Sequence, residues 1–250
     1  MNKETREVLV LDAVVSFVDR LLIDFDVVDL LTELTERCAE LLNVAAVGFL
    51  LADPFGKLRF LAATSEQARE LELFQLQADE GPCLDCFATG EPVSVTDLEQ
   101  AVGQWPRFVP AALRAGFASV HAVPMRAAGE ALGALGLFGI ARGELSDADR
   151  LVAQTLAHIA CVAILQEHAP STIGPQLRSA LTSRVVVEQA KGFLGEVLDV
   201  SVEEAFAVLR GYSRDHGEHL TDVARRLMTD RTSRPALLAS ITEFARKSTG

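Results

Sequence analysis

Several scarcities limit what this chain can be. Aromatic residues make up only 6% of its 250 residues, with a single Trp and a single Tyr. Its four cysteines are too few for the disulfide framework of a small secreted domain. The chain contains no second closely spaced Cys pair that would complete a zinc site. We therefore expect neither a disulfide scaffold nor a metal.

Long apolar runs are also missing, and we expect no leader sequence. No window reaches the roughly 18–20 uninterrupted apolar residues of a membrane helix. The first residues, Met1 to Arg6, are polar and charged and lack the small-residue cleavage site of a secretory signal. With 49% apolar and 23% charged residues, the composition is that of a soluble globular protein. These features predict a cytoplasmic protein with no membrane partner.

Negative charge is abundant but unevenly distributed. The formal net charge is −12. Residues 1–174 hold 12 Lys and Arg against 25 Asp and Glu, a balance of −13, whereas residues 175–250 hold 11 against 10, a balance of +1. Because affinity for phosphate depends on local positive charge, only the C-terminal part is expected to bind a nucleic acid.

Helical and extended patterns follow one another in the first part of the chain. Residues 7–25 are densely apolar and predict a helix within an N-terminal segment, 1–26. Asp26 is the expected N-cap of a second helix. The apolar residues of that helix form one stripe at helical spacing: Leu30, Leu31, Leu34, Cys38, Leu41 and Leu42. Two short apolar runs, Ala45–Ala52 and Leu58–Ala63, flank a turn sequence and predict a hairpin.

Four further helices are expected before the end of this part. Their expected bounds are residues 65–77, 81–90, 99–115 and 146–168. We expect the third to continue through Pro106 and Pro110. Ser146, with Asp149 three residues on, forms a cap for the last one.

Three further strands are expected between these helices: Val93–Val95, Ser119–Arg126 and Ala131–Ile140. The last two are joined by a tight turn that contains Gly129. Helices first, then strands mixed with helices, and then a closing helix describe an α+β domain built on an antiparallel sheet. We assign this domain to residues 27–168.

A short linker and a second, all-helical domain follow. Residues 169–175 contain two prolines and are predicted to form a linker. The second domain is assigned to residues 176–231, and a further helix, beginning at Pro235, is expected in a C-terminal segment, 232–250.

Three helices are expected in this second domain. The first, about Leu177–Leu198, is expected to pack through one face: Val186, Ala190, Phe193 and Val197. Ser201 with Glu204 forms a capping box for the second helix. The third is expected over about Glu218–Thr229.

Three motifs in the second domain carry a family resemblance. They are Val186–Leu194, Ser201–Phe206 and Leu220–Ala224. Over about residues 177–230 they resemble the ANTAR domain, the RNA-binding module of bacterial antitermination regulators. The resemblance implies a three-helix unit that binds paired RNA hairpins and favours an antiterminator over a terminator fold.

Ten residues of this domain are candidates for RNA contact. The candidates for phosphates are cationic: Arg184, Lys191, Arg210, Arg214, Arg225 and Arg226. The candidates for unstacked bases are polar: Gln189, Ser213, His219 and Thr221. Arg210 and Arg214 share one helix face, and we expect Arg184 and Lys191 on the side of the first helix that is away from its packing face. The alternative is an ordinary solvated surface in which these last two pair with Glu188.

The larger domain carries a second resemblance, through Glu80–Asp85, Trp105–Phe108 and Ala131–Leu137. Over about residues 27–168 the chain is similar to a GAF domain, of the kind joined to ANTAR modules in actinobacterial regulators. The family implies an antiparallel sheet with flanking helices around a pocket that holds a small molecule in some members. Because proteins of one fold differ in ligand, the cofactor stays unknown.

Cys83 and Cys86 are the one feature of the larger domain that suggests a specific chemistry. Their spacing permits a redox pair, and the position of Cys83 near a helix start predicts a lowered thiol pKa. The alternatives are a redox sensor, a thiol enzyme similar to GAF-fold methionine sulfoxide reductases, and two packing residues. His121, in a strand, and Trp105, beside a proline, are expected to be structural, and no catalytic residue is predicted.

Together the two resemblances predict a regulator whose GAF domain senses a signal and whose ANTAR domain binds hairpins in nascent mRNA, affecting RNA polymerase indirectly. Two hairpins need two helical domains, so we expect a homodimer. The apolar stripes of the N-terminal helix and of residues 146–168 offer a helical interface, and either stripe is equally compatible with packing within one chain. An interaction adaptor that binds protein instead of RNA is the remaining alternative.

Overall fold

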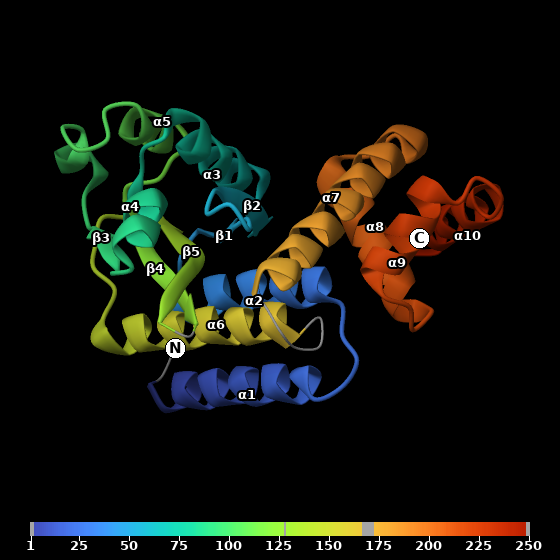
Figure 1. Cartoon of the computed structure of the whole chain (residues 1–250), viewed down its shortest axis with the longest axis horizontal. Coiled ribbons are helices and arrows are strands. Elements are labelled where there is room, and N and C mark those ends of the chain that lie inside the picture. Colours follow the sequence, from blue (N-terminus) through green and yellow to red (C-terminus); the bar gives the residue numbers. More distant parts are fainter. Residues whose placement is uncertain (1–2, 128, 167–172, 249–250) are drawn as a thin grey trace. The chain divides into compact units, whose positions relative to one another are not determined.

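The computed structural model describes residues 3–127, 129–166 and 173–248 (Figure 1). The chain divides into two compact units. Unit 1 consists of residues 1–24 and 30–178, and unit 2 of residues 25–29 and 179–250. The short segment Phe25–Asp29 thus belongs to the C-terminal unit, although it lies near the N-terminus in sequence.

Unit 1 is built on a five-stranded antiparallel sheet with the strand order β2-β1-β5-β4-β3. The strands are β1 (Ala46–Ala52), β2 (Leu58–Ala63), β3 (Val93–Val95), β4 (Ser119–Ala127) and β5 (Glu130–Gly139). Both expected hairpins are confirmed, because β1 pairs with β2 and β4 pairs with β5, each in antiparallel register. Gly129 has the positive φ of 87° that the tight β4–β5 turn requires.

Helices cover both faces of this sheet. They are α1 (Lys3–Leu21), α2 (Val27–Leu42), α3 (Glu66–Ala78), α4 (Pro82–Thr89), α5 (Phe108–Arg114) and α6 (Asp147–Gln166), with a short 3-10 helix, Leu98–Ala101. Figure 1 shows α6 with α1 and α2 on one face and α3, α4 and α5 on the other. The predicted α+β class is confirmed.

Caps predicted from the sequence fix the starts of these helices. Asp26 Oδ1 accepts hydrogen bonds from the amides of Val28 at 2.9 Å and Asp29 at 3.0 Å, so the predicted N-cap of α2 is confirmed. Ser146 Oγ accepts from the Asp149 amide at 3.1 Å, and Asp149 Oδ2 accepts from the Ser146 amide at 3.2 Å. The predicted apolar stripe of α2 is buried throughout.

The expected single helix over residues 99–115 is wrong. The structure has the 3-10 helix Leu98–Ala101, then a turn, and then α5. Trp105 precedes Pro106, and the residue before a proline is disfavoured in helical conformation, so the first helix cannot continue. Pro110 is tolerated because it lies in the first turn of α5, where backbone amides have no intrahelical acceptor.

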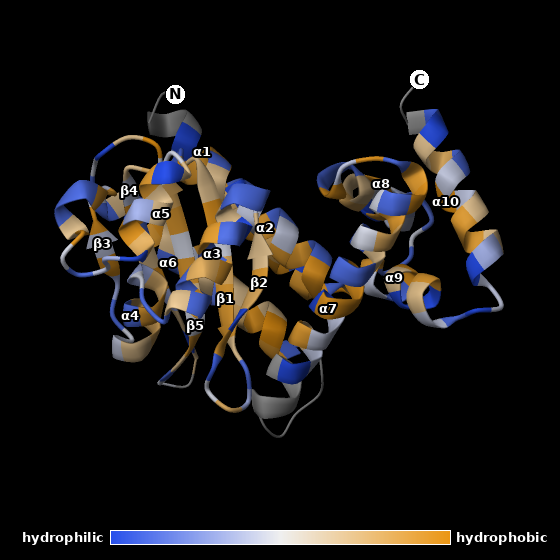
Figure 2. Ribbon diagram, turned by 90° about the horizontal axis from the view of Figure 1, so that it is seen from above, coloured by the Kyte–Doolittle hydropathy of each residue, from blue (hydrophilic) through white to orange (hydrophobic). Residues whose placement is uncertain are grey.

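The core of unit 1 is formed by the strands and the helices packed on them. Every residue of β1 is buried, and Figure 2 shows hydrophobic colours concentrated along the strands. One cluster packs α3 and α5 against the sheet, with Phe108 and Phe138 among its largest members. A second cluster packs α4 on the sheet through Cys83 and Cys86. Both cysteines therefore contribute to packing.

By length and composition, α6 is the one helix among the described residues that could cross a membrane. It packs on β4 and β5 and buries a long row of side chains, including Leu156, Ala160 and Ile164. The core helix of a soluble domain has the same composition. In this structure α6 packs as a core helix of unit 1.

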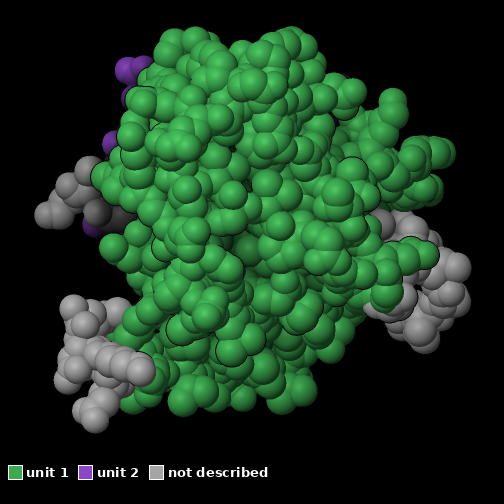
Figure 3. All heavy atoms as spheres, turned by 90° about the vertical axis from the view of Figure 1, so that its left-hand side faces the viewer, with its two compact units in different colours: residues 1–24, 30–178 green, residues 25–29, 179–250 purple. Residues whose placement is uncertain are grey.

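Unit 2, of which Figure 3 shows only a few atoms in purple, is helical. Its helices are α7 (Ile173–Leu198, from residue 179 on), α8 (Val202–Asp215), α9 (Leu220–Thr229) and α10 (Arg234–Ser248). α8 packs on α9, and α10 packs on both. The predicted capping box is confirmed, because Ser201 and Glu204 accept each other's backbone amides at the start of α8.

Two expectations for α7 need correction. Residues 173–175 of the predicted linker belong to the helix, and residues 169–172 lie outside the described residues. The expected packing face, with Val186 and Val197, is also wrong, because Val197 is 44% exposed. The fully buried apolar residues are Ala180, Val187, Ala190 and Leu194. Three consecutive valines, 185–187, give the apolar pattern no clear phase, and packing selects the last of them.

Candidate nucleic-acid interface

The ten residues expected to contact RNA all lie in unit 2, but they differ in exposure. Four are buried: Arg184, Lys191, Ser213 and Thr221. Four are exposed: Gln189, Arg214, Arg225 and Arg226. Arg210 and His219 are half-buried. Exposed cations are thus found on α8 and α9, and the two candidate cations of α7 are buried.

Arg184 and Lys191 do not lie on an open face of α7, contrary to expectation. Glu188 Oε1 lies 2.5 Å from Arg184 Nη2 and 3.1 Å from Lys191 Nζ. The Lys191 ammonium also lies 5.2 Å from the centre of the Phe206 ring, a cation–π distance. The exposed fraction of the side chain is 8% for Arg184 and 9% for Lys191. The expected ion pairs with Glu188 are therefore present but buried, and these cations stabilise the unit.

Arg210 and Arg214 lie one turn apart on α8 and share a carboxylate. Arg210 Nε lies 2.6 Å from Asp29 Oδ1, and Arg214 Nη2 lies 3.2 Å from Asp29 Oδ2. Half of the Arg214 side chain is exposed, whereas only 11% of the Asp29 side chain is. The two guanidinium groups form a charge-assisted anion site, and Asp29 of the same unit is the anion that it holds.

A second anion position lies at the start of α9. The Thr221 amide, in the first turn of this helix, donates to Asp26 Oδ2 at 2.6 Å. The positive end of the helix dipole stabilises a carboxylate placed there. Thr221 Oγ1 is buried and makes no hydrogen bond within the part of the chain that the structure describes. The backbone of Thr221, not its hydroxyl, therefore holds the anion.

The remaining cations of α9 pair on the surface. Arg225 Nη1 lies 2.8 Å from Asp222 Oδ1, and Arg226 pairs with Glu218. Both pairs are well exposed, and exposed pairs contribute little stability, so a phosphate can replace the carboxylate. Ser213 is buried and donates to a backbone carbonyl one turn earlier at 2.9 Å, so its expected contact with a base is not available in this structure.

His216, which is not among the predicted residues, places its ring at the end of α8. This ring stacks on Tyr212, with centroids 4.0 Å apart and 23° between the planes. Tyr212 is held in turn by an edge contact with Phe244 and by a hydrogen bond from its hydroxyl to Ser240 Oγ at 3.1 Å. Unstacked RNA bases stack on such rings. The spacing of four residues between Tyr212 and His216 was the available signal.

In unit 1, Cys83 belongs to a buried polar cluster with Glu72 and Gln75. Cys83 Sγ donates to Glu72 Oε1 at 3.7 Å, the Cys83 amide donates to Gln75 Oε1 at 3.1 Å, and Gln75 Nε2 donates to Glu72 Oε2 at 2.9 Å. Gly48 and Gly136 face each other across β1 and β5. A Cβ atom on either would lie 2.6 or 2.5 Å from Glu72 Oε1, so the two glycines make room for the carboxyl group.

Burial determines the acid–base chemistry of this cluster. It raises the pKa of Glu72 to about 8. Burial, followed by the charge of Glu72, raises the pKa of Cys83 well above its usual value, and burial raises the pKa of Cys86 to about 12. The expected lowering of the Cys83 pKa is therefore wrong, because desolvation outweighs the helix start. Both thiols stay protonated near neutral pH and are poor nucleophiles.

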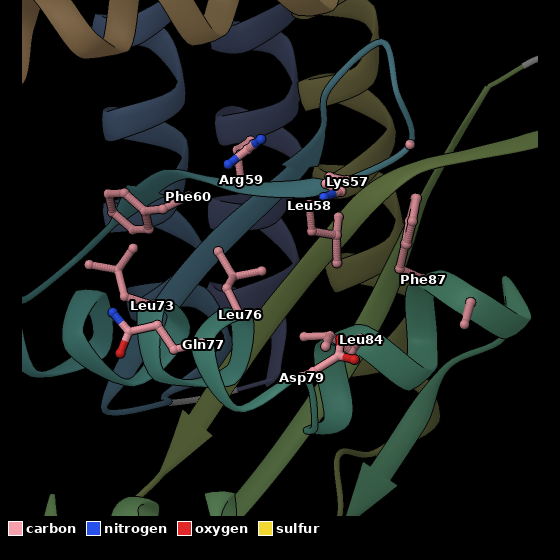
Figure 4. Close-up of a pocket in the computed structure, with 12 residues that line it drawn as sticks. Lys57, Leu58, Arg59, Phe60, Leu73, Leu76, Gln77, Asp79, Leu84 and Phe87 are labelled. Atoms are coloured by element: carbon pink, nitrogen blue, oxygen red, sulfur yellow. The ribbon is translucent and has the colours of Figure 1, made fainter.

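An open groove of about 820 Å³ lies between β2, α3 and α4. Figure 4 shows the side chains of Leu58, Leu76, Leu84 and Phe87 pointing toward one another from these three elements. Lys57, the residue directly before β2, lines the same groove. An apolar floor with a cation beside it suits a small molecule that has an apolar body and an anionic group.

The two residues expected to be structural make hydrogen bonds within unit 1. Trp105 is buried, and its Nε1 donates to Asp85 Oδ2 at 3.1 Å. His121 Nδ1 lies 2.6 Å from Ser94 Oγ, and burial lowers the pKa of His121. Within the described residues, no three His, Cys, Asp or Glu side chains are grouped so as to hold a metal ion.

Comparison with known families agrees with these observations. The sequence pattern of the GAF domain matches residues 26–165, which is more than half of the chain. The protein belongs to the GAF domain family. The pattern of the ANTAR domain matches residues 175–228, which cover all of α8 and nearly all of α7 and α9. A GAF sensor domain followed by an ANTAR RNA-binding domain makes this GAF protein a regulator of the ANTAR type, and both are regulatory domains of a typically soluble kind.

A solved structure shows the same fold for the GAF part. The GAF domain of a phosphoenolpyruvate-protein phosphotransferase from Acinetobacter has a TM-score of 0.51 and 16% identity, over 73% of this chain and 97% of that one. A free methionine-R-sulfoxide reductase from Neisseria meningitidis, solved with its substrate, has a TM-score of 0.46 and 17% identity, over 68% and 89%. Likeness at this level gives no activity. No curated protein matches the chain.

Proposed function

We propose that this GAF–ANTAR protein binds paired RNA hairpins in nascent transcripts and promotes transcription antitermination under the control of its GAF domain. The observation that carries the proposal is the ANTAR match over a helical unit in which Arg210 and Arg214 already form an anion site. RNA polymerase is affected indirectly, because the bound hairpins prevent the terminator from forming.

The proposed contact surface is formed by α8 and α9. Arg214, Arg225 and Arg226 expose roughly half of their side chains and are suited to loop phosphates. The His216 ring, held on Tyr212, offers a stacking surface for an unpaired base. Phosphate contacts position the RNA and base contacts select it, and this surface has both kinds of group.

Binding of a labelled two-hairpin RNA by the full chain tests this assignment. Replacing Arg210 and Arg214 together by Ala removes two phosphate-binding cations, so affinity should fall roughly tenfold or more. The slope of log affinity against log salt concentration should become shallower by about two, because about two fewer counter-ions are released. Arg246→Ala removes an exposed cation of α10 and is the matched control, expected to bind as the wild type does. Equal affinity of the double variant and this control would contradict the assignment.

We further propose that the protein acts as a homodimer through an apolar seam on α1. The seam residues are between 44% and 65% exposed: Val8, Leu11, Val15 and Val18. Their alternating spacing of three and four residues is that of the a and d positions of a heptad. The opposite side of α1 buries Ala13 and Phe17, and α1 packs on α6. The seam is therefore left for a second copy of the chain.

The residue types of the seam favour two parallel helices. Val8 and Val15 place β-branched side chains at a positions and Leu11 lies at a d position, as in parallel two-stranded coils, whereas Val18 occupies the other d position. Asp12 and Asp19 both lie at e positions. In an antiparallel pair the e positions face each other, so like charges would meet.

Sedimentation velocity tests the seam. Val15→Asp places a charge in the apolar seam and should convert dimers to monomers, because the charge would have to be buried. Ser16→Asp adds the same charge at an exposed position outside the seam and should leave the dimer intact. Wild-type protein that is monomeric both with and without RNA would refute the dimer.

For the signal, we propose a small carboxylic acid bound in the groove of Figure 4, with its apolar part on Leu76, Leu84 and Phe87 and its carboxylate near Lys57. A thermal-shift screen of such acids tests the site. Stabilisation that is lost in Leu84→Trp, which fills the groove, supports it. Stabilisation that the variant retains contradicts it.

A further inference from the structure

The RNA surface proposed above already holds two carboxylates in this structure, those of Asp26 and Asp29. We propose that these two residues occupy phosphate positions and restrain RNA binding until they are displaced. The inference rests on the proposed function, because the restrained site is the α8–α9 surface. The segment Phe25–Asp29 belongs to unit 2, so all of these contacts lie within one compact unit.

Asp29 engages the two arginines of α8 as a phosphate group would. It accepts from Arg210 Nε at 2.6 Å, and Arg214 Nη2 donates to both of its carboxylate oxygens, at 3.3 and 3.2 Å. Carboxylate and phosphate oxygens use the same guanidinium donors. Only 11% of the Asp29 side chain and 13% of the Arg210 side chain are exposed. A phosphate can therefore reach Arg210 only after Asp29 has moved.

Asp26 fills the second position, at the start of α9. Its Oδ2 accepts from the Thr221 amide at 2.6 Å. The first amides of a helix and the positive end of its dipole are a common phosphate site. Two carboxylates, three residues apart in sequence, thus cover the guanidinium pair of α8 and the N-terminus of α9. The segment imitates two phosphates of an RNA backbone.

The same segment is tied to the start of α2. While Asp26 Oδ2 binds α9, Asp26 Oδ1 accepts from the amides of Val28 and Asp29 and caps α2. α2 continues from Asp29 into Leu30, where the chain enters unit 1. A ligand-induced shift at the start of α2 would therefore change the occupancy of the RNA surface. The GAF domain is thus connected through the chain of α2 to the segment that covers the RNA surface.

Charge removal in the segment separates restraint from a purely structural pairing. Asp29→Asn keeps the side-chain shape, and its full-length variant should bind a labelled two-hairpin RNA roughly three- to tenfold more tightly than the wild type, since the competing anion is lost. Asp26→Asn keeps an oxygen for the α2 cap and should give a smaller gain. Glu196→Gln removes an exposed charge from α7 of the same unit and should leave affinity unchanged. Circular dichroism melts establish that each variant is folded.

The outcomes distinguish this inference from the proposed function. Tighter binding by Asp29→Asn that disappears when Arg210 and Arg214 are also replaced by Ala supports restraint. If the wild type binds the RNA and neither aspartate variant binds it more tightly, restraint is overturned and the proposed function stands. An equal gain in Glu196→Gln also overturns restraint, because net charge alone would explain it. If neither the wild type nor any variant binds, the proposed function fails and the inference falls with it.

Discussion

The two units of this protein bury ionisable side chains in different ways. In unit 1, Glu72 is held by an amide and a thiol, and its pKa is raised to about 8. In unit 2, the buried Arg184 and Lys191 and the half-buried Arg210 each lie against a carboxylate, at 2.5, 3.1 and 2.6 Å. A buried acid is thus neutralised by a proton in one unit, and buried cations are neutralised by counter-ions in the other.

The difference follows from the chemistry of the groups. A carboxyl group can bind a proton near neutral pH when burial raises its pKa, whereas an arginine does not lose its proton in a protein. A buried guanidinium group therefore needs a carboxylate partner. All six candidate cations of unit 2 have one. The number of cationic residues in the sequence therefore overestimates the positive charge that is available to bind RNA.

The largest effect is expected where the counter-ion of unit 2 is removed. Glu188→Gln takes away the carboxylate that Arg184 and Lys191 share, so the free energy of unfolding should fall by roughly 2–4 kcal/mol. Glu196→Gln, an exposed position on the same helix, should change it by less than about 0.5 kcal/mol. Urea unfolding followed by circular dichroism measures both. Similar stability of the two variants would mean that the buried pairs do not need their carboxylate.

A smaller, pH-dependent effect is expected in unit 1. Because burial raises the pKa of Glu72 from 4.5 to about 8, the folded protein holds a proton that the unfolded chain has lost between these values. The resulting stability is complete below the lower value and is lost as pH rises through the higher one. The free energy of unfolding should fall by up to about 1.4 kcal/mol per pH unit in this window.

Glu72→Gln removes this titration while keeping a side chain of the same shape. Its unfolding free energy should lack the decline that the wild type shows between the two pKa values. Urea unfolding at several pH values gives the difference between the two proteins, in which the titration of His121 and of the surface acids cancels. Parallel pH profiles would contradict a protonated Glu72 in the folded state.

The smallest effect is expected from the thiols. All four cysteines are free and buried, and the pKa of Cys83 and of Cys86 is raised. Iodoacetamide should therefore modify none of them quickly in the folded protein near neutral pH, and RNA affinity should be the same under reducing and oxidising conditions. Mass spectrometry of the alkylated protein checks the first point. Rapid modification of Cys83, or affinity that changes with oxidation, would restore the redox-sensor alternative.

Local chemistry was sufficient to predict most elements of both units. The caps at Asp26, Ser146 and Ser201 depend on residues within one helical turn, and the hairpins depend on alternation and turn residues, so the sequence carries these signals directly. The helix predicted over residues 99–115 is wrong because its apolar content does not outweigh the constraint that Pro106 places on its neighbour.

The candidate site was less predictable, because its partners are distant in sequence. Helical spacing places Arg210 and Arg214 on one face, but Asp29 is 181 residues from Arg210, and no local pattern indicates that it belongs to the same unit. The burial of Glu72 likewise depends on two glycines of different strands, Gly48 and Gly136, which only the sheet register brings together.

Crosslinking tests the central claim, that α8 and α9 bind RNA hairpins. Protein crosslinked to RNA in cells should yield transcripts that share a paired-hairpin element, with crosslinked peptides within residues 210–226. The yield should drop sharply in the Arg210→Ala, Arg214→Ala double variant. Recovered RNA without a shared hairpin element, or a yield that the double variant leaves unchanged, would contradict the claim.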